Sequence, residues 1–302
     1  MSELGTSEPA TGEPATSGLV VVRPGPLTTV QDLGRRGVAH LGVPRAGALD
    51  EPALRAANRL VGNEPGAAGL ETTLGGVALR AVGTVVVAVT GAPAPVRVAG
   101  RAAAWGAPVV VPDGAVVEVG AATDGVRGYL AVAGGIAVPP VLGSRSTDLL
   151  SGLGPAPLRA GDRLPVGTPP PPRDRPELVP LPAPPAELVL RLRLGPRADW
   201  FTADAVGRLG RDGYRVSSTS NRVGLRTEGP AVARAREGEL PSEGMVLGAV
   251  QIPPDGQPVV FLADHPTTGG YPVIGVVPAA DLAAAAQARP GTPVRFAPLR
   301  ER

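Results

Sequence analysis

The chain has 302 residues, 43% of them hydrophobic and 3% aromatic, and a formal net charge of +2 at pH 7. It contains no cysteine, no lysine and only two histidines. These counts exclude disulfides, a cysteine zinc site, a multi-histidine metal cluster, a P-loop lysine and a lysine that carries biotin within this sequence. Charges of both signs are interspersed and no apolar run approaches the ~20 residues of a membrane span, so we expect neither nucleic acid nor membrane as a partner.

Residues 1–18 have neither the basic start nor the apolar stretch of a secretory signal. We expect a disordered leader there and a cytoplasmic location. A strand follows from Leu19. Asp50 is then a good N-cap for a helix over Glu51–Val61, with proline in its first turn and glycine after its end.

The middle of the chain reads as a series of short strands separated by glycine-rich turns, a pattern typical of a meander or barrel. The expected strands cover Thr84–Thr90, Val96–Val98, Pro108–Val111, Ala115–Val119 and Tyr129–Ala133. Abundant glycine (42) and proline (37) favour the same interpretation.

A proline-rich stretch divides the chain, because such sequences are semi-rigid and pack poorly in a core. We therefore predict an N-terminal unit over 19–168, a linker over 169–186 and a C-terminal unit over 187–302. In the second unit we expect a strand at Leu188–Leu194, helices at Asp199–Leu209 and Asp281–Gln287, and a strand at Val294–Phe296.

The densest run of chemistry-capable residues lies between Gln251 and Tyr271. Two predicted strands, Met245–Ile252 and Pro258–Ala263, flank a Pro-Pro-Asp-Gly turn, which is a hairpin signal. The second strand leads into a polar loop whose hydroxyls and N–H groups could hold an anion. Its residues are Asp264, His265, Thr267, Thr268, Gly269, Gly270 and Tyr271. The alternative is a tight loop whose polar groups satisfy only its own turns.

Several segments together resemble one known family, the biotin-dependent carboxyltransferases that include the C-type subunit of 5-oxoprolinase and allophanate hydrolase subunit 2. They are GPLTTVQDLGRRG, LGVPRAGALD and AANRLVGN within Gly25–Asn63, SNRVGLRTEGP at Ser220–Pro230, and SEGMVLGAVQIPPDGQPVVFLADHPTTGGYP at Ser242–Pro272. LETTLGG, YLAVAGGI and LGPRADWFT extend the likeness from about Leu19 to Phe296.

The resemblance implies a mainly β fold of two cyclophilin-like β-barrel subdomains with a few short helices. It also implies a B-type subunit that completes the active site, and a third, A-type subunit, for a reaction that opens 5-oxoproline to glutamate at the expense of ATP. ATP with Mg²⁺ would be shared with the partner. The same fold serves urea carboxylation with carboxybiotin, and biotin would then be attached to another chain.

Candidate site residues are inferred from side-chain chemistry and from the family resemblance together. Gln31 and Asp32 could orient an amide and a proton or cation, or Asp32 could pair with Arg35 or Arg36. Asp264 is the third catalytic candidate, with a polar or metal role, and the metal site itself stays open. Candidate substrate- or nucleotide-binding residues are Arg45, Asn58, Glu71, Asn221, Arg222, Gln251, His265, Thr267, Thr268, Gly269, Gly270 and Tyr271.

Several binding candidates have a plainer alternative. Arg45 could be a solvated loop arginine, Glu71 a surface residue, and Asn221 a residue at a bend. Arg222 could read a carboxylate, and His265 is assigned to binding, although its titration range permits acid–base work. We expect His40 in the core or beside the site.

Three functions remain open from the sequence. The first is the C-type subunit of an ATP-dependent 5-oxoprolinase acting on a lactam. The second is a carboxyltransferase subunit acting on urea or another amide. The third is a non-catalytic regulator that binds a kinase-inhibitor partner, as one branch of the family is described as doing.

Overall fold

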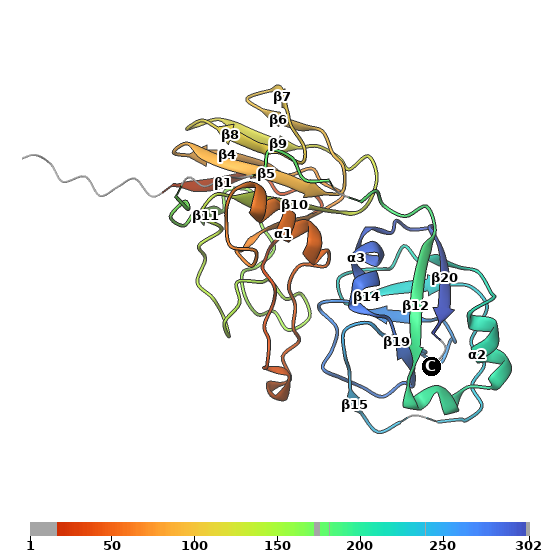
Figure 1. Cartoon of the computed structure of the whole chain (residues 1–302). Helices are drawn as coiled ribbons and strands as arrows, with labels where there is room; N and C mark the ends of the chain where they lie inside the picture. The colour runs from red at the N-terminus through yellow and green to blue at the C-terminus, as the bar shows by residue number, and fades with distance from the viewer. Residues whose placement is uncertain (1–16, 172–175, 181, 239, 300–302) are drawn as a thin grey trace, which may run out of the picture.

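A computed structural model describes residues 17–171, 176–180, 182–238 and 240–299 (Figure 1). The predicted leader falls almost wholly outside these residues. No helix in the described part of the chain is long and apolar enough to cross a membrane.

The first half of the chain forms two packed sheets. Sheet A has the order β11-β1-β4-β9-β6-β7, and sheet B the order β2-β3-β10-β5-β8. The strands of sheet A are β1 (Gly18–Arg23), β4 (Ala78–Val82), β6 (Val96–Val98), β7 (Arg101–Ala103), β9 (Val116–Val119) and β11 (Arg163–Pro165). Those of sheet B are β2 (Leu27–Gln31), β3 (Gly69–Thr73), β5 (Val85–Gly91), β8 (Pro108–Val111) and β10 (Arg127–Val132).

Strand alternation explains how this half builds its core. Successive side chains point to opposite faces of a strand, and one row across sheet B faces sheet A inside the apolar core. That row comprises Val30, Leu70, Leu130 and Val89. Helix α1 (Glu51–Leu60) packs on the other face of sheet B, as Figure 1 shows, with Asp50 capping it by accepting from the Ala53 backbone N–H at 3.0 Å.

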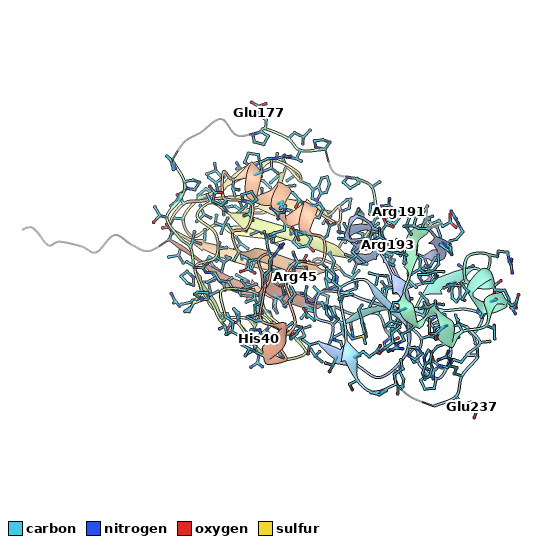
Figure 2. The ribbon with its side chains drawn as sticks, turned by 60° about the horizontal axis from the view of Figure 1, so that its bottom comes forward. His40, Arg45, Glu177, Arg191, Arg193 and Glu237 are labelled. Carbon is cyan, nitrogen blue, oxygen red and sulfur yellow. The ribbon has the colours of Figure 1, made fainter. Side chains whose placement is uncertain are left out.

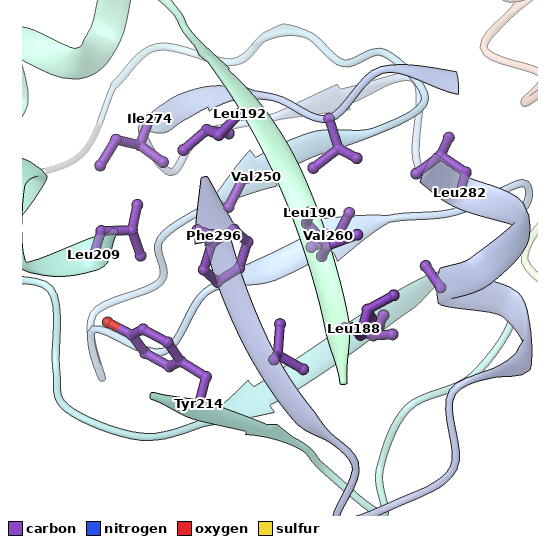
Figure 3. Packing of buried hydrophobic residues seen from close by; sticks show 14 of the residues in the cluster. Leu188, Leu190, Leu192, Leu209, Tyr214, Val250, Val260, Ile274, Leu282 and Phe296 are labelled. Carbon is purple, nitrogen blue, oxygen red and sulfur yellow. The ribbon is translucent and has the colours of Figure 1, made fainter. Parts of the chain in front are cut away.

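The second half forms a closed barrel in the order β12-β19-β16-β17-β14-β13-β20. Its strands are β12 (Leu188–Leu194), β13 (Tyr214–Val216), β14 (Gly224–Glu228), β16 (Ala249–Gln251), β17 (Val259–Phe261), β19 (Val273–Val276) and β20 (Pro293–Pro298). Leucine, valine and aromatic side chains fill its interior (Figure 3). The other elements are the 3₁₀ helices η1 (Ala39–Leu41) and η2 (Pro196–Trp200), the helices α2 (Ala203–Leu209) and α3 (Ala279–Gln287), and the strand pair β15 (Glu243–Gly244) with β18 (Thr268–Gly269).

The prediction of a mainly β chain with a few short helices and two barrel-like halves is confirmed. The helix capped by Asp50 and the β16–β17 hairpin also form as predicted. The helix predicted over Asp199–Leu209 forms only from Ala203 to Leu209, because the chain is extended at Phe201 and Thr202. Thr202 there caps α2 by accepting from the Ala205 N–H. The domain boundaries inferred from the proline-rich stretch stay a prediction.

Alternation along β12 gives a direct test of the second core. Leu190 is completely buried, whereas its neighbour Val189 is 37% exposed. We expect Leu190→Ala to lower the free energy of unfolding by about 2–5 kcal/mol because it leaves a cavity. Val189→Ala is the matched control on the same strand, and urea unfolding should show for it a loss of about 1 kcal/mol or less. Equal losses for the two variants would contradict this packing.

Candidate functional site

A row of polar side chains crosses the outer face of sheet B, the face turned away from its core. The strand register places four of them side by side, namely Thr29, Glu71, Tyr129 and Thr90. All four are at most 2% exposed. The Tyr129 hydroxyl donates to Glu71 at 2.8 Å and accepts from the Asp50 N–H, while Thr90 donates to the Ala53 carbonyl in α1. The row is therefore buried by α1, its leading loop and the second half of the chain.

Arg222 joins this row to the second half. Its Nε and Nη2 donate to the two carboxylate oxygens of Asp264 at 2.9 and 3.0 Å, and Nη1 donates to Glu71. Nη2 also donates to the Gly47 carbonyl at 2.7 Å. All three charged side chains are at most 1% exposed. A bidentate, fully buried arginine thus links carboxylates from the two halves.

These contacts decide one alternative that the sequence left open. Glu71 is not a surface residue, because it lies on a central strand whose outer face the second half covers. The carboxylates that Arg222 reads here are the protein's own, so its contact with a substrate carboxylate stays a prediction.

Burial and the neighbouring charges shift the pKa values of the groups in this cluster. Burial raises the pKa of Glu71, but Arg222 and Arg127, with the Leu49 N–H and Tyr129, outweigh it and leave that pKa below its usual value. Burial raises the pKa of Asp264, with opposition from Arg222. Burial beside Glu71 holds the pKa of Tyr129 well above its usual value, so its hydroxyl remains a donor.

Asp32 lies at the end of β2 and is saturated with hydrogen bonds. Its carboxylate accepts from the Ser144 and Ser146 hydroxyls, both at 2.6 Å, and from the N–H groups of Gly34 and Arg145. The alternative pairing of Asp32 with Arg35 or Arg36 does not occur among the described residues, where Arg35 instead donates to main-chain carbonyls. Asp32 therefore fixes the 144–146 loop against β2.

Gln31 lies beside that loop, and its side-chain oxygen has no hydrogen-bond partner among the described residues. Its Nε2 donates to Thr29 and to the Thr147 carbonyl, both at 3.0 Å, and the side chain is fully buried. Its Oε1 and the Thr147 hydroxyl have no partner among the described residues. Buried polar atoms are rarely left unpaired, so these two atoms are candidates for contact with a water molecule or a ligand.

The same loop connects Gln31 to Asp264. Thr147 accepts from Gln31, and two residues later the Leu149 N–H donates to Asp264 at 3.3 Å. The 46–48 segment adds further links, because the Ala46 N–H donates to Ala263 and the Ala48 N–H to Asp32. The structure thus brings together Gln31, Asp32, Glu71, Arg222 and Asp264, which are far apart in the sequence.

The loop after Asp264 lies next to this cluster. His265 stacks on Phe261, and its Nδ1 donates to the Pro266 carbonyl at 2.7 Å, which leaves Nε2 as an acceptor. Burial lowers the pKa of His265 and favours its neutral form. Gly269 has no left-handed backbone, but a Cβ there would lie 2.9 Å from the Gln251 side chain, so close packing accounts for this glycine.

The other candidates on this loop make structural contacts. Gln251 donates to the Tyr271 carbonyl. Thr268 is exposed, while Thr267 and Gly270 are half-buried and accept main-chain hydrogen bonds.

Four further positions either lie away from the Arg222 cluster or make hydrogen bonds that stabilise the fold. Arg45 is half-buried and bonded to Glu51 and the Leu33 carbonyl, and Asn58 is buried in α1 and donates to the Ala67 carbonyl. Asn221 accepts from two following N–H groups in a turn. His40, expected in the core, is exposed in η1 at the edge of the molecule (Figure 2).

Tyr129, Thr29 and Thr147 were missed as site residues. A tyrosine in an otherwise apolar strand, and the threonines of β2, were the available signals. Only the strand register shows that Thr29 and Tyr129 face the same side.

Cavities in the described part of the chain include the following three. The largest, about 840 Å³, lies between α1, the proline-rich stretch and α3. A small one of about 70 Å³ is lined by Arg45 and the loop before α1. The third lies against β7 and β8. The side chains of the Arg222 cluster are themselves buried between the halves.

No group of three acidic or histidine side chains among the described residues could hold a metal ion. Arg222 and Arg45 are both paired with carboxylates of the chain. The donor set around the cluster therefore does not fit Mg²⁺ or nucleotide phosphates by itself.

By its fold, this chain is a β protein of two barrel-like subdomains, which a buried ionic cluster joins. The sequence matches the family described as "Carboxyltransferase domain, subdomain A and B" over residues 41–298, and the chain belongs to that family. It is 40% identical to the C-type subunit of 5-oxoprolinase from Escherichia coli over 92% of this chain and 90% of that protein. It is 35% identical to the corresponding 5-oxoprolinase protein of Haemophilus influenzae over 89% and 87%.

A larger enzyme contains the same fold. The solved structure of Kluyveromyces lactis urea amidolyase superposes with a TM-score of 0.87 at 31% identity, over 96% of this chain and 19% of that one. This chain therefore corresponds to about a fifth of that enzyme.

The depressed pKa of Glu71 predicts a pH-dependent stability. Its ionised form is favoured in the folded state, so the stabilisation is present above the unfolded pKa of about 4.3 and is lost as the pH falls through the folded value. Glu71→Gln leaves Arg222 with one carboxylate, and we expect a loss of about 3–5 kcal/mol at pH 7. Urea unfolding at pH 7, 5 and 3.5 should show the difference from the wild type shrinking below about pH 4.

The matched control is Glu187→Gln, which removes an exposed ion pair with Arg295. It should change stability by less than about 1 kcal/mol. A pH-independent loss for Glu71→Gln would contradict the ionic role of this carboxylate.

Proposed function

We propose that this chain is the C-type subunit of a heteromeric ATP-dependent 5-oxoprolinase, which converts 5-oxoproline to glutamate together with A-type and B-type subunits. The observation that carries the proposal is the end-to-end match with two proteins named as C-type subunits of 5-oxoprolinase, each covered to 87% or more. A cytoplasmic location is part of the proposal, since ATP and a free amino-acid lactam are its reactants.

In this proposal the Gln31 side chain orients the lactam. Its free Oε1 accepts the lactam N–H, and the Thr147 hydroxyl donates to the lactam oxygen. A lactam resists hydrolysis until its oxygen is activated, and phosphorylation by ATP would supply that activation. Positioning and electrostatic stabilisation are then the contributions expected from this chain.

Asp264 is the proposed acid–base group, because burial raises its pKa while Arg222 fixes its geometry. Asp32 holds the loop that carries Thr147. His265, Thr267, Thr268 and Tyr271 lie on the same loop as Asp264 and are proposed to meet the substrate or the partner. Because the paired arginines here do not fit phosphates, we place ATP and Mg²⁺ mainly on the B-type subunit.

A second candidate function is carboxyl transfer to urea or a related amide. The fold shared with urea amidolyase favours it. This sequence has no lysine, so carboxybiotin would come from a separate carrier. The same Gln31 and Thr147 atoms would then hold the amide.

Reconstitution tests the two functions. The chain, co-purified with its A- and B-type subunits, should release glutamate from 5-oxoproline with ATP, and without bicarbonate or a biotin carrier. Gln31→Ala and Asp264→Asn should each lower kcat at least 100-fold, as expected for lost positioning or proton transfer.

Gln257→Ala, in the hairpin turn, is the matched control and should keep full activity. Turnover of urea only with bicarbonate and a carboxylated carrier would replace the first proposal with the second. A folded complex with neither activity would overturn both and favour a binding role.

A further inference from the structure

The cavity of about 840 Å³ lies away from the Arg222 cluster. Three elements enclose it, namely α1, α3 and the proline-rich stretch between the halves. Its volume is within the range of sites for drug-sized molecules. Nothing in the proposed reaction uses this space.

The walls of the cavity are apolar and built from small, rigid side chains. Alanine methyls from both helices face proline rings of the stretch. The alanines are Ala53, Ala56, Ala280, Ala283 and Ala284, and the prolines are Pro180, Pro182, Pro184 and Pro185. Such surfaces suit a flat apolar body, since neither alanine nor proline loses side-chain entropy when a ligand covers it.

Positive charge on α1 restricts which apolar ligands fit the cavity. Arg55 and Arg59 line it one turn apart on α1. Arg55 is bonded to Glu51, but the exposed Arg59 side chain forms no hydrogen bond or ion pair with any described residue. Arg59 is therefore free to bind an anion.

The opposite end of the cavity carries the Asp50 carboxylate, about 13 Å away along the helix axis. Its two oxygens accept from the Ala53 N–H and from Gln287, at 3.0 and 2.8 Å. Its oxygens thus already have donors, and at this separation, beyond the Debye length of about 10 Å, its charge opposes an anion at Arg59 only weakly.

We propose that this cavity binds a flat, mostly apolar molecule with one carboxylate, which Arg59 holds. The site spans both halves, so its ligand would favour the packed arrangement of α1 against α3. Asp50 also connects the cavity to the Arg222 cluster, because its N–H donates to Tyr129 and Tyr129 donates to Glu71. Occupancy would therefore influence the cluster.

The test uses the full chain alone and a matched pair of probes. 2-Naphthoate has the proposed chemistry, and 2-naphthamide has the same shape without charge. Calorimetry should show one saturable site that prefers the carboxylate about tenfold, as a charge-assisted hydrogen bond would give. The melting temperature should rise by a few degrees at saturation.

Variants separate the two parts of the site. Arg59→Met keeps the stem and should abolish the preference for the carboxylate, while Arg163→Met, on β11 in the other sheet, should change nothing. Ala284→Trp should fill the cavity and abolish binding of both probes. Ala280→Trp, at an exposed position of the same wall, serves if the first variant misfolds.

The proposal is overturned if no saturable binding is found up to millimolar concentration, or if Arg59→Met keeps the preference. Binding that both tryptophan variants retain overturns it as well. Because binding is measured without partner subunits or turnover, a negative result here leaves the proposed reaction untouched, and an inactive complex leaves this site untouched.

Discussion

One buried guanidinium determines how the two halves of this chain fit together. Removing Arg222, Glu71 and Asp264 from water is costly, and their attraction compensates only when the geometry is good. Here every polar nitrogen of Arg222 has an acceptor, and Glu71 receives further donors from Leu49 and Tyr129. A sliding or rotation of one half would leave buried charges unpaired. The cluster therefore specifies a single arrangement more than it adds net stability.

This arrangement of the halves explains why polar side chains on the outer face of sheet B are buried. In an isolated barrel, the outer face of such a sheet would be exposed to water. Polar side chains such as Thr29, Glu71 and Tyr129 would be expected on such an exposed face. Here the row is buried, because α1 and the second half cover it. Most of the apolar side chains of each half lie in a cluster of their own, and the polar row lies between the first of these clusters and the second half.

Local signals were enough to predict much of the fold but not this layer. Asp50 as a cap, proline in the first turn of α1 and the turn between β16 and β17 are short-range features, and they were predicted from the sequence. Glu71 and Arg222 are 151 residues apart in the chain. No periodicity predicts such a contact, so a surface position stayed open as the alternative for Glu71. His40 was placed inside on its apolar neighbours, but η1 projects from the sheet and exposes it.

The contact between the halves is uneven from one end to the other. Around Arg222 it is filled by ion pairs and hydrogen bonds, and at Gln287 the end of α3 is bonded to Asp50 and to the main chain of Arg127. Next to Gln287, α1, α3 and the proline-rich stretch line a large apolar cavity. Close packing normally removes such space, and polar networks transmit small displacements because their members have few alternative partners. Asp50 belongs both to the cavity wall and to the network that ends at Asp264. A change in how α1 meets α3 therefore has a direct physical route to the carboxylate proposed to act on the substrate.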